Sequence, residues 1–289
     1  MVTGAASGIG AATAARLAAA GWRVVGVDKD KGSGPVDHVD HVDHGDHVGH
    51  VDVVADLGTA EGRRRVVDEV AERSGGTLAG VVTCAGLGGS PDRAGSLLVG
   101  VNYFGTVDVL EGLRPFLART PGAAAVAISS NSTTVQPAIP ADLVAALLAH
   151  DEERSAAVAD AQGSLTTYPA TKLALAHWVR TVAVGPDWAG AGIRLNAIAP
   201  GMIDTPMVAA MRAEPETAPL LDMLPIPLGR PGRPEEIAAL VEFLLDGESS
   251  FFCGSVVFCD GGSDALLRTR DWPAAWDISV RALGTQLSS

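Results

Sequence analysis

Short apolar segments alternate along this chain with longer segments of helical periodicity. The short segments are too continuously apolar for half-exposed strands and are typical of parallel strands covered on both faces. We expect buried strands at residues 23–27, 51–55, 78–83, 123–129, 193–198 and 255–259. We expect helices between them at residues 10–20, 59–73, 97–119, 166–188 and 234–245. This alternation implies right-handed crossovers, so the predicted fold class is α/β, a doubly wound parallel sheet in a single Rossmann-fold domain.

The first strand is expected to be very short. Only Met1 and Val2 precede Thr3, where a glycine-rich turn begins, although the first strand of such a sheet is central. Two explanations stay open: the natural chain starts upstream of Met1, or the central strand is frayed.

Two segments interrupt the alternation. Residues 35–52 have low complexity and repeat Asp-His pairs with a period of three, which matches neither strand nor helix. We expect a solvated loop whose deletion changes stability and activity little, because long loops add little closure entropy; the alternative is a Zn²⁺ or Ni²⁺ site. Residues 131–165, rich in Ala and Leu, form an insertion after the fifth strand that could hold two short helices.

Composition narrows the class of partner. The chain carries 34 acidic and 21 basic residues, for a net charge of −13, so we expect no nucleic acid and no membrane as partner, since both need a basic surface. Its three cysteines provide no framework of disulfides, and the chain begins on a glycine turn rather than a signal peptide. A cytoplasmic location is therefore predicted, and no metal site is assigned.

A glycine-rich turn precedes the first expected helix. Glycines allow a tight turn and let the backbone approach a pyrophosphate at the helix N-terminus. The turn residues expected at a cofactor are Gly4, Ser7, Gly8, Ile9 and Gly10. Asp28 follows the second strand, where a carboxylate can accept hydrogen bonds from both adenosine ribose hydroxyls and repels a 2′-phosphate. Each feature alone is also found as an ordinary turn or strand end; together they predict NAD as the cofactor.

Tyr168 and Lys172 lie four residues apart in a helical pattern and therefore share one face. An ammonium beside a phenol favours the phenolate, which makes tyrosine usable as a base near neutral pH. Taken alone, this spacing is also that of a surface pair. Its weight comes from the other motifs of the chain.

In their order and context these residues resemble the short-chain dehydrogenase/reductase family. The similarity spans roughly residues 1–264 and leaves residues 265–289 as a C-terminal extension. Within the family the chain resembles bacterial 3α-hydroxysteroid dehydrogenase/carbonyl reductases, because of residues 85–88, 101–105 and 194–201 and the long gap after Ser130. The resemblance implies a soluble oxidoreductase that interconverts a secondary alcohol and a ketone, assembled as a homodimer or homotetramer.

The resemblance also implies a role for each matching residue. Tyr168 would be the acid/base, and Lys172 would bind the nicotinamide ribose and lower the pKa of the tyrosine. Ser130, preferred to Ser129 as the second serine of the family's pair, would bind the substrate oxygen. Asn102 would hold a water in a proton relay.

Further positions would contact the cofactor. Asp56 and Leu57 would lie against the adenine, and Thr205 would touch the nicotinamide carboxamide. The other positions implied are Cys84, Ala85, Gly86, Pro200, Gly201 and Ile203. One departure is that Thr83-Cys84 stands where the family often has two asparagines, which could loosen support of the central strand.

The substrate is expected to be a small alcohol or ketone. Residues 202–227 combine apolar side chains with five prolines, so they cannot form one helix and could close over an apolar ligand. Residues 131–165 could form a second wall or a subunit contact. Neither segment carries a cluster of Arg or Lys, so we expect a neutral, mostly apolar ring compound of steroid or terpenoid size. The alternatives are a non-catalytic dinucleotide sensor, which would usually lack the Tyr/Lys pair, and a metal-binding interaction protein that uses the Asp/His repeat.

Overall fold

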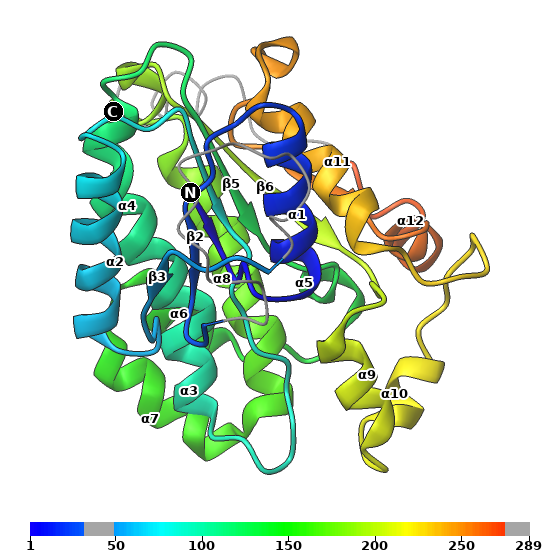
Figure 1. Cartoon of the computed structure of the whole chain (residues 1–289). Helices are drawn as coiled ribbons and strands as arrows, with labels where there is room; N and C mark the ends of the chain where they lie inside the picture. Colours follow the sequence, from blue (N-terminus) through cyan, green and yellow to red (C-terminus); the bar gives the residue numbers. More distant parts are fainter. Residues whose placement is uncertain (32–48, 275–289) are drawn as a thin grey trace, which may run out of the picture.

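Seven parallel strands form the sheet at the centre of the chain, in the order β3-β2-β1-β4-β5-β6-β7 (Figure 1). A computed structural model describes residues 1–31 and 49–274. The strands are β1 Val2–Thr3, β2 Gly26–Asp28, β3 Val53–Val54, β4 Gly80–Thr83, β5 Ala124–Ile128, β6 Arg194–Pro200 and β7 Val256–Cys259. The strand order reverses between β1 and β4, which places a crevice at the carboxyl ends of these two strands. The predicted doubly wound parallel sheet is confirmed.

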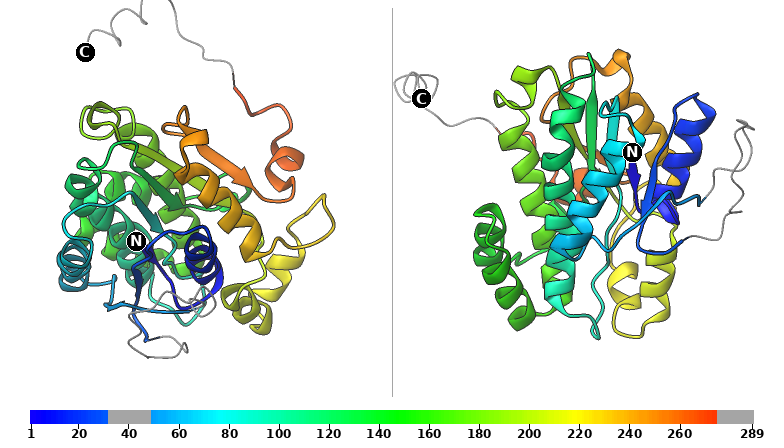
Figure 2. Two further views of the ribbon diagram at one scale, coloured as in Figure 1. Left: turned by 45° about the horizontal axis from the view of Figure 1, so that its top comes forward. Right: turned by 60° about the vertical axis from the view of Figure 1, so that its left-hand side comes forward.

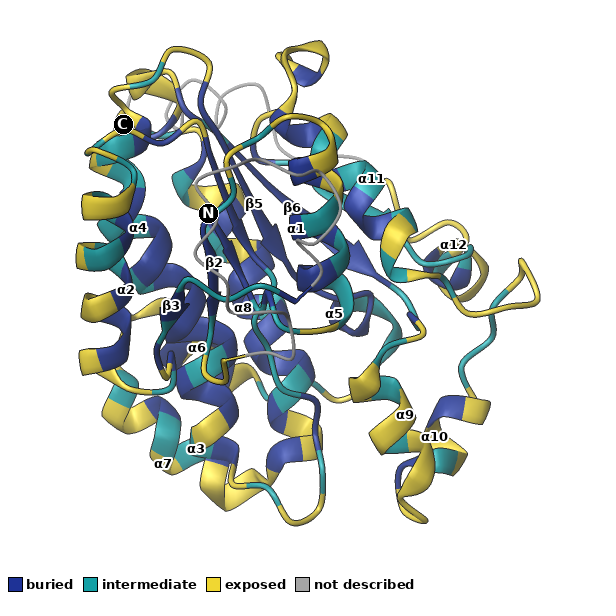
Figure 3. Ribbon diagram, viewed as in Figure 1, coloured by how far each residue is buried: buried dark blue, intermediate teal, exposed yellow. Residues whose placement is uncertain are grey.

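Helices cover both faces of the sheet and bury two separate apolar clusters (Figure 3). On one face α1 (Gly8–Ala19) packs against α11 (Pro234–Leu245). The other face is covered by α2 (Ala60–Arg73), α4 (Gly105–Leu117) and α8 (Ser164–Val182). All these helices were expected from periodicity, but α4 begins eight residues after its expected start and α8 ends six residues before its expected end.

The short first strand lies in the middle of the sheet, as expected. Val2 pairs with Gly26 of β2 on one side and with Val82 of β4 on the other. Two residues are therefore enough to join the two halves of the sheet. The turn that follows β1 begins at the crevice.

The helix expected at residues 97–119 is divided into three parts. A short helix α3 (Gly95–Leu98) leads into a π-helical turn, η1 (Val99–Phe104), and then into α4. Helical periodicity does not reveal such a π turn, which is often found at functional sites. Here it carries Asn102.

The insertion after β5 holds three helices rather than two. They are α5 (Ser132–Val135), α6 (Ala141–Leu148) and α7 (Glu152–Gln162). Arg63 of α2 fixes the insertion to the domain, because its buried guanidinium pairs with Asp108 of α4 at 2.8 Å and with Glu152 of α7 at 2.6 Å. His150 lies between α6 and α7 and pairs with Asp108 at 3.2 Å.

The proline-rich segment at residues 202–227 is divided into α9 (Pro206–Ala213) and α10 (Ala218–Asp222), as the prolines predict. The two helices extend beyond the carboxyl end of the sheet (Figure 2). The remaining elements are the 3₁₀ turns η2 (Ala189–Ala191) and η3 (Gly247–Ser249) and the helix α12 (Ser263–Arg268). Most of the Asp/His repeat and the end of the C-terminal extension lie outside the described residues. None of the helices in the described ranges is long and apolar enough to span a bilayer.

Candidate active site

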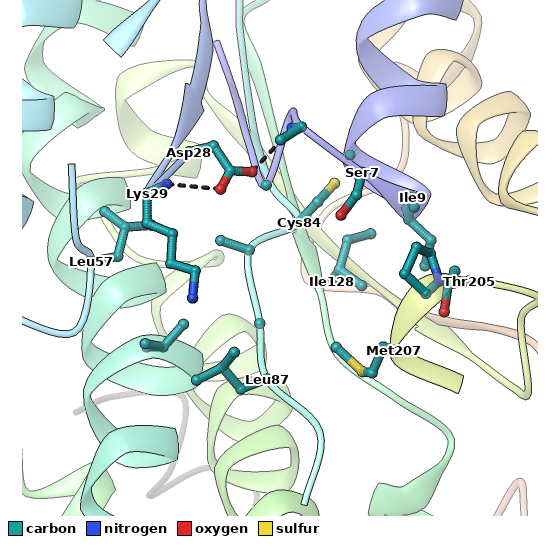
Figure 4. Close-up of a pocket in the computed structure, with 18 of the residues that line it drawn as sticks. Ser7, Ile9, Asp28, Lys29, Leu57, Cys84, Leu87, Ile128, Thr205 and Met207 are labelled. Carbon is teal, nitrogen blue, oxygen red and sulfur yellow. Dashed lines mark hydrogen bonds between the residues drawn. The ribbon is translucent and has the colours of Figure 1, made fainter. Parts of the chain in front are cut away.

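One cavity of about 580 Å³ lies at the carboxyl ends of β1, β2, β4, β5 and β6. It is lined by all the residues predicted for the site except Asn102, although they come from distant parts of the chain (Figure 4). These residues are Gly4, Ser7, Gly8, Ile9, Gly10, Asp28, Asp56, Leu57, Cys84, Ala85, Gly86, Ser130, Tyr168, Lys172, Pro200, Gly201, Ile203 and Thr205.

The glycine-rich turn is packed too closely for side chains. Gly4 has a φ of +68°, and a β-carbon there would lie 2.9 Å from the backbone nitrogen of Ala85. A β-carbon on Gly10 would lie 2.0 Å from the carbonyl oxygen of Gly4. The turn therefore brings the first turn of α1, whose N–H groups have no partner inside the helix, to the cavity wall. Such an N-terminus is suited to a pyrophosphate.

Asp28 lies at the end of β2, at one end of the cavity. Its carboxylate accepts hydrogen bonds from the backbone N–H of Ala6 at 3.0 Å and from that of Lys29 at 2.8 Å (Figure 4). The contact with Ala6 joins the carboxylate to the glycine turn. Asp56 belongs to the adjacent loop after β3, where its carboxylate accepts the N–H of Gly58 at 2.8 Å. Three carboxylates thus line this end of the cavity, since Asp30 lies there as well.

Tyr168 and Lys172 lie on one face of α8 at the other end of the cavity. The ammonium of Lys172 lies 6.0 Å from the centre of the Tyr168 ring and donates a hydrogen bond to the carbonyl oxygen of Ile128 at 2.9 Å. Burial lowers the pKa of Lys172 to about 8. Burial raises the pKa of the Tyr168 phenol, and a hydrogen bond with Ser130 opposes this rise. The Ser130 hydroxyl thus favours deprotonation of the phenol, and the Lys172 ammonium lies close enough to stabilise a phenolate by its charge.

Ser129 and Ser130 both lie at the end of β5, but their hydroxyls have different partners. Ser129 donates to the carbonyl oxygen of Lys172 at 2.9 Å, which uses its proton inside the protein. The oxygen of Ser130 accepts the backbone N–H of Ser132 at 3.1 Å and interacts with Tyr168. This arrangement supports Ser130 as the serine that faces a substrate oxygen.

Asn102 does not line the cavity but holds one of its walls. Its amide forms two hydrogen bonds with the backbone of Leu87: the oxygen accepts the N–H at 2.7 Å, and the nitrogen donates to the carbonyl at 2.9 Å. The nitrogen also lies 3.4 Å from the hydroxyl of Thr171. The π turn thereby fixes the loop after β4. The water relay that the family resemblance implies for Asn102 stays a prediction.

Two further predicted residues have clear local roles. Thr205 caps α9, because its hydroxyl accepts the backbone N–H of Val208 at 3.4 Å. Cys84 is half-buried, and desolvation raises the pKa of its thiol to about 12, so the thiol is neutral near pH 7. The support that a family asparagine would provide is replaced in part by Thr3, whose hydroxyl accepts the N–H of Ala85 at 3.0 Å.

The sequence did not single out six residues that line the cavity: Ala6, Asp30, Ala55, Arg93, Leu97 and Ile128. Position in the chain could have suggested Asp30, because it lies three residues after the strand predicted at residues 23–27. Arg93 gave no such signal, since it lies in a loop. Residues 131–165, proposed as a second wall, contribute no side chain to this cavity.

The fold and the arrangement of these residues define an oxidoreductase that binds a dinucleotide, and comparison with known proteins agrees. Residues 1–141 match the family "short chain dehydrogenase", and residues 154–264 match the family "Enoyl-(Acyl carrier protein) reductase". The chain belongs to the short-chain dehydrogenase/reductase family and is an enzyme that acts on an alcohol or a ketone.

Particular relatives narrow this class. The 3-alpha-hydroxysteroid dehydrogenase/carbonyl reductase of Comamonas testosteroni is 34% identical over 93% of this chain and 97% of its own. The crystal structure of the 3-alpha-hydroxysteroid dehydrogenase from Pseudomonas sp. B-0831, complexed with NADH, has a TM-score of 0.82 at 40% identity and covers the same shares of the two chains. RhlG of Pseudomonas aeruginosa, solved with NADP, has a TM-score of 0.67 at 27% identity and covers 91% of this chain and 94% of its own.

Proposed function

We propose that the protein uses NAD(H) to interconvert a secondary alcohol and a ketone on an apolar ring compound, with Tyr168 as acid/base. The observation that carries this proposal is that Ser130, Tyr168 and Lys172 share one cavity with the glycine turn and Asp28. A dinucleotide site and a proton-transfer site therefore face the same space.

The described residues fit NAD(H). The N-terminus of α1 suits the pyrophosphate, and the close packing at Gly4 and Gly10 leaves the backbone N–H groups open to it. Asp28 suits the adenosine ribose and disfavours a 2′-phosphate. The Pseudomonas relative complexed with NADH supports this choice, whereas RhlG shows that the fold also accepts NADP. Lys29, which also lines the cavity, partly offsets the charge of Asp28.

The chain's own residues supply proton transfer and orientation. The substrate oxygen lies between the hydroxyl of Ser130 and the phenol of Tyr168. During oxidation Tyr168 accepts the hydroxyl proton, and during reduction it returns that proton to the carbonyl oxygen. Lys172 stabilises the phenolate with its positive charge. The nicotinamide, when bound, supplies the hydride acceptor or donor.

The walls of the cavity favour an apolar substrate. Leu87, Ile128, Met207 and Val208 line it, and methionine adapts to irregular apolar shapes. Met207 belongs to the α9–α10 segment, which the sequence suggested as a wall. The names of the relatives from Comamonas and Pseudomonas support a hydroxysteroid-like ring.

A screen of cyclic secondary alcohols and ketones tests this function. The expected result is NAD⁺ reduction, followed by NADH absorbance, with steroid and terpenoid alcohols preferred to open-chain sugars and sugar phosphates. A much higher kcat/KM for small open-chain hydroxy acids or sugar phosphates would contradict the ring substrate. NADH binding without turnover of any alcohol or ketone would favour the dinucleotide sensor.

A further inference from the structure

The loop between β4 and α3 passes from the catalytic lysine to the edge of the cavity. A β-carbon on Gly86 would lie 3.5 Å from the ammonium nitrogen of Lys172. A β-carbon on Gly88 would lie 3.2 Å from Cγ of Met207 on α9. A β-carbon on Gly89 would lie 3.0 Å from Cα of Leu165 on α8. The loop therefore runs between α9 and the N-terminal turn of α8, on the catalytic side of the cavity.

Arg93 lies near the end of this loop and places a positive charge at the wall of the cavity. Its side chain is half-buried and lines the cavity, and its guanidinium donates a hydrogen bond to the carbonyl oxygen of Gly88. Because Gly88 lies against the side chains of Met207 and Met211 of α9, the guanidinium is held where the loop meets this helix. A guanidinium has five N–H donors, so several stay available beyond the bond to Gly88.

Within the described part of the chain, no carboxylate neutralises the charge of Arg93. Other arginines near the surface pair with carboxylates, such as Arg212 with Asp222 at 3.3 Å and Arg230 with Glu236 at 2.7 Å. Across residues 1–31 and 49–274 no carboxylate forms an ion pair with Arg93. The cavity carboxylates lie at the adenosine end of the cavity: Asp28 ends β2, and Asp30 and Asp56 belong to the loops after β2 and β3.

We propose that Arg93 binds an anionic group of the substrate, a carboxylate, at the end of the molecule remote from the reacting carbon. This inference rests on the proposed alcohol–ketone function and specifies its substrate class as a ring alcohol or ketone that carries an acid. The planar guanidinium matches a carboxylate through two parallel hydrogen bonds. The sequence led to the expectation of a neutral substrate because residues 131–165 and 202–227 carry no cluster of Arg or Lys. Arg93 lies in a third segment, outside both.

The pyrophosphate of the cofactor is the other anion that could reach the cavity, and the structure favours the substrate. The N-terminus of α1 already provides a pyrophosphate site on the glycine-turn wall. Arg93 is instead bound to Gly88, which faces Met207 and Met211 of the wall that we assign to the substrate. Its loop leaves the glycine turn at Ala85, passes Lys172 at Gly86 and reaches α9 at Gly88.

Matched substrates that differ only in charge test this proposal. We would measure kcat/KM for 3α-hydroxycholanic acid and its methyl ester, and for cis-4-hydroxycyclohexanecarboxylate and its methyl ester, at saturating NAD⁺. The variants are Arg93→Gln, Arg93→Lys and the control Arg154→Gln, which removes an exposed arginine of α7 away from the cavity. KM for NAD⁺ is measured for each protein.

The expected result is that Arg93→Gln lowers kcat/KM for the acids by about 10- to 100-fold, the range of a lost charge-assisted hydrogen bond. The kcat/KM for the esters and the KM for NAD⁺ should each change by less than about twofold. Arg93→Lys should recover part of the loss, and Arg154→Gln should resemble the wild type. An equal loss for acids and esters, or a raised KM for NAD⁺ with unchanged preference, overturns the proposal.

A binding measurement separates this proposal from the proposed function. Dissociation constants of the acids and esters for the enzyme–NADH complex are determined by calorimetry, which needs no turnover. If the acids bind more tightly than the esters and Arg93→Gln abolishes this difference, the anion site is supported even if these alcohols are not oxidised. Turnover of the esters without any preference for the acids keeps the proposed function and rejects the anion site.

Discussion

The ammonium of Lys172 donates a hydrogen bond to the carbonyl oxygen of Ile128, the last residue of β5, at 2.9 Å. This bond links α8 to the strand end that carries Ser130. It keeps the cation 6.0 Å from the centre of the Tyr168 ring, in a site where burial lowers the pKa of the lysine to about 8. The spacing of Ser130, Tyr168 and Lys172 is therefore set by the attachment of α8 to the sheet.

Tyr168→Phe tests the acid/base role. We expect kcat to fall by about 10²–10⁴-fold, because a proton-transfer group is removed, while the dissociation constant for NADH changes little. The chain has only one other tyrosine, Tyr103, which is buried outside the cavity, so Tyr103→Phe is the matched control. Steady-state kinetics and NADH titration give both quantities. Near-normal turnover by Tyr168→Phe would falsify the mechanism.

Lys172→Met tests the electrostatic role through the pH profile. Alcohol oxidation needs the phenolate of Tyr168, so its rate should rise with pH, whereas ketone reduction needs the phenol and should fall. Without the positive charge of Lys172 the phenolate is less stable, so the apparent pKa of the oxidation profile should move to higher pH. The exposed Lys31, which does not line the cavity, provides the control Lys31→Met. An unchanged profile in Lys172→Met would show that the charge does not act on the tyrosine.

Asp28→Asn tests the choice of cofactor. We expect kcat/KM with NADP⁺ to rise by about 10-fold or more relative to NAD⁺, because a like-charge contact with the 2′-phosphate is removed. Asp30→Asn is a matched control two residues away, since Asp30 also lines the cavity but forms no hydrogen bond with the glycine turn. Both cofactors are compared at a fixed alcohol concentration. A wild-type preference for NADP⁺, or a larger effect of Asp30→Asn, would contradict the assignment to Asp28.

Arg63→Met tests the ion pairs that hold the insertion. Arg63 is 3% exposed, whereas its partners Asp108 and Glu152 are 29% and 43% exposed, so the loss should cost about 1–3 kcal/mol of unfolding free energy. Hydrogen exchange should increase first in α6 and α7. The control is Arg65→Met, whose exposed pair with Glu69 should contribute at most about 0.5 kcal/mol. Equal destabilisation by the two variants would mean that burial of Arg63 adds nothing.

The sequence predicted the sheet well because buried parallel strands are marked by continuous apolar runs. The helix start at Pro234 was predicted to the residue, since proline and the following glutamates favour a first turn. The π turn at Asn102 was not predicted. Its position depends on tertiary contacts, such as that of Gly100, where a β-carbon would lie 2.8 Å from the carbonyl oxygen of Gly58.

The residues of the cavity were predictable where a motif connects chemistry to spacing. The glycine turn, Asp28 and the Tyr168–Lys172 pair belong to this group, and the structure brings them to one cavity. Arg93 could not be found in this way, because it reaches the cavity only through the fold of its loop and a bond to Gly88. Its side chain has no periodic or spaced partner in the sequence.

The two segments that interrupt the regular alternation, residues 131–165 and 202–227, are attached to the domain in different ways. This difference bears on protein engineering. The Arg63–Glu152 pair joins α7 to the domain, whereas α9 buries none of its residues and packs mainly against α10. Residues 206–222 can therefore be exchanged as a cassette between relatives without rebuilding the core. Such a chimera would retain Ser130, Tyr168, Lys172 and the glycine turn, and we expect the cassette to change the substrate that the enzyme accepts.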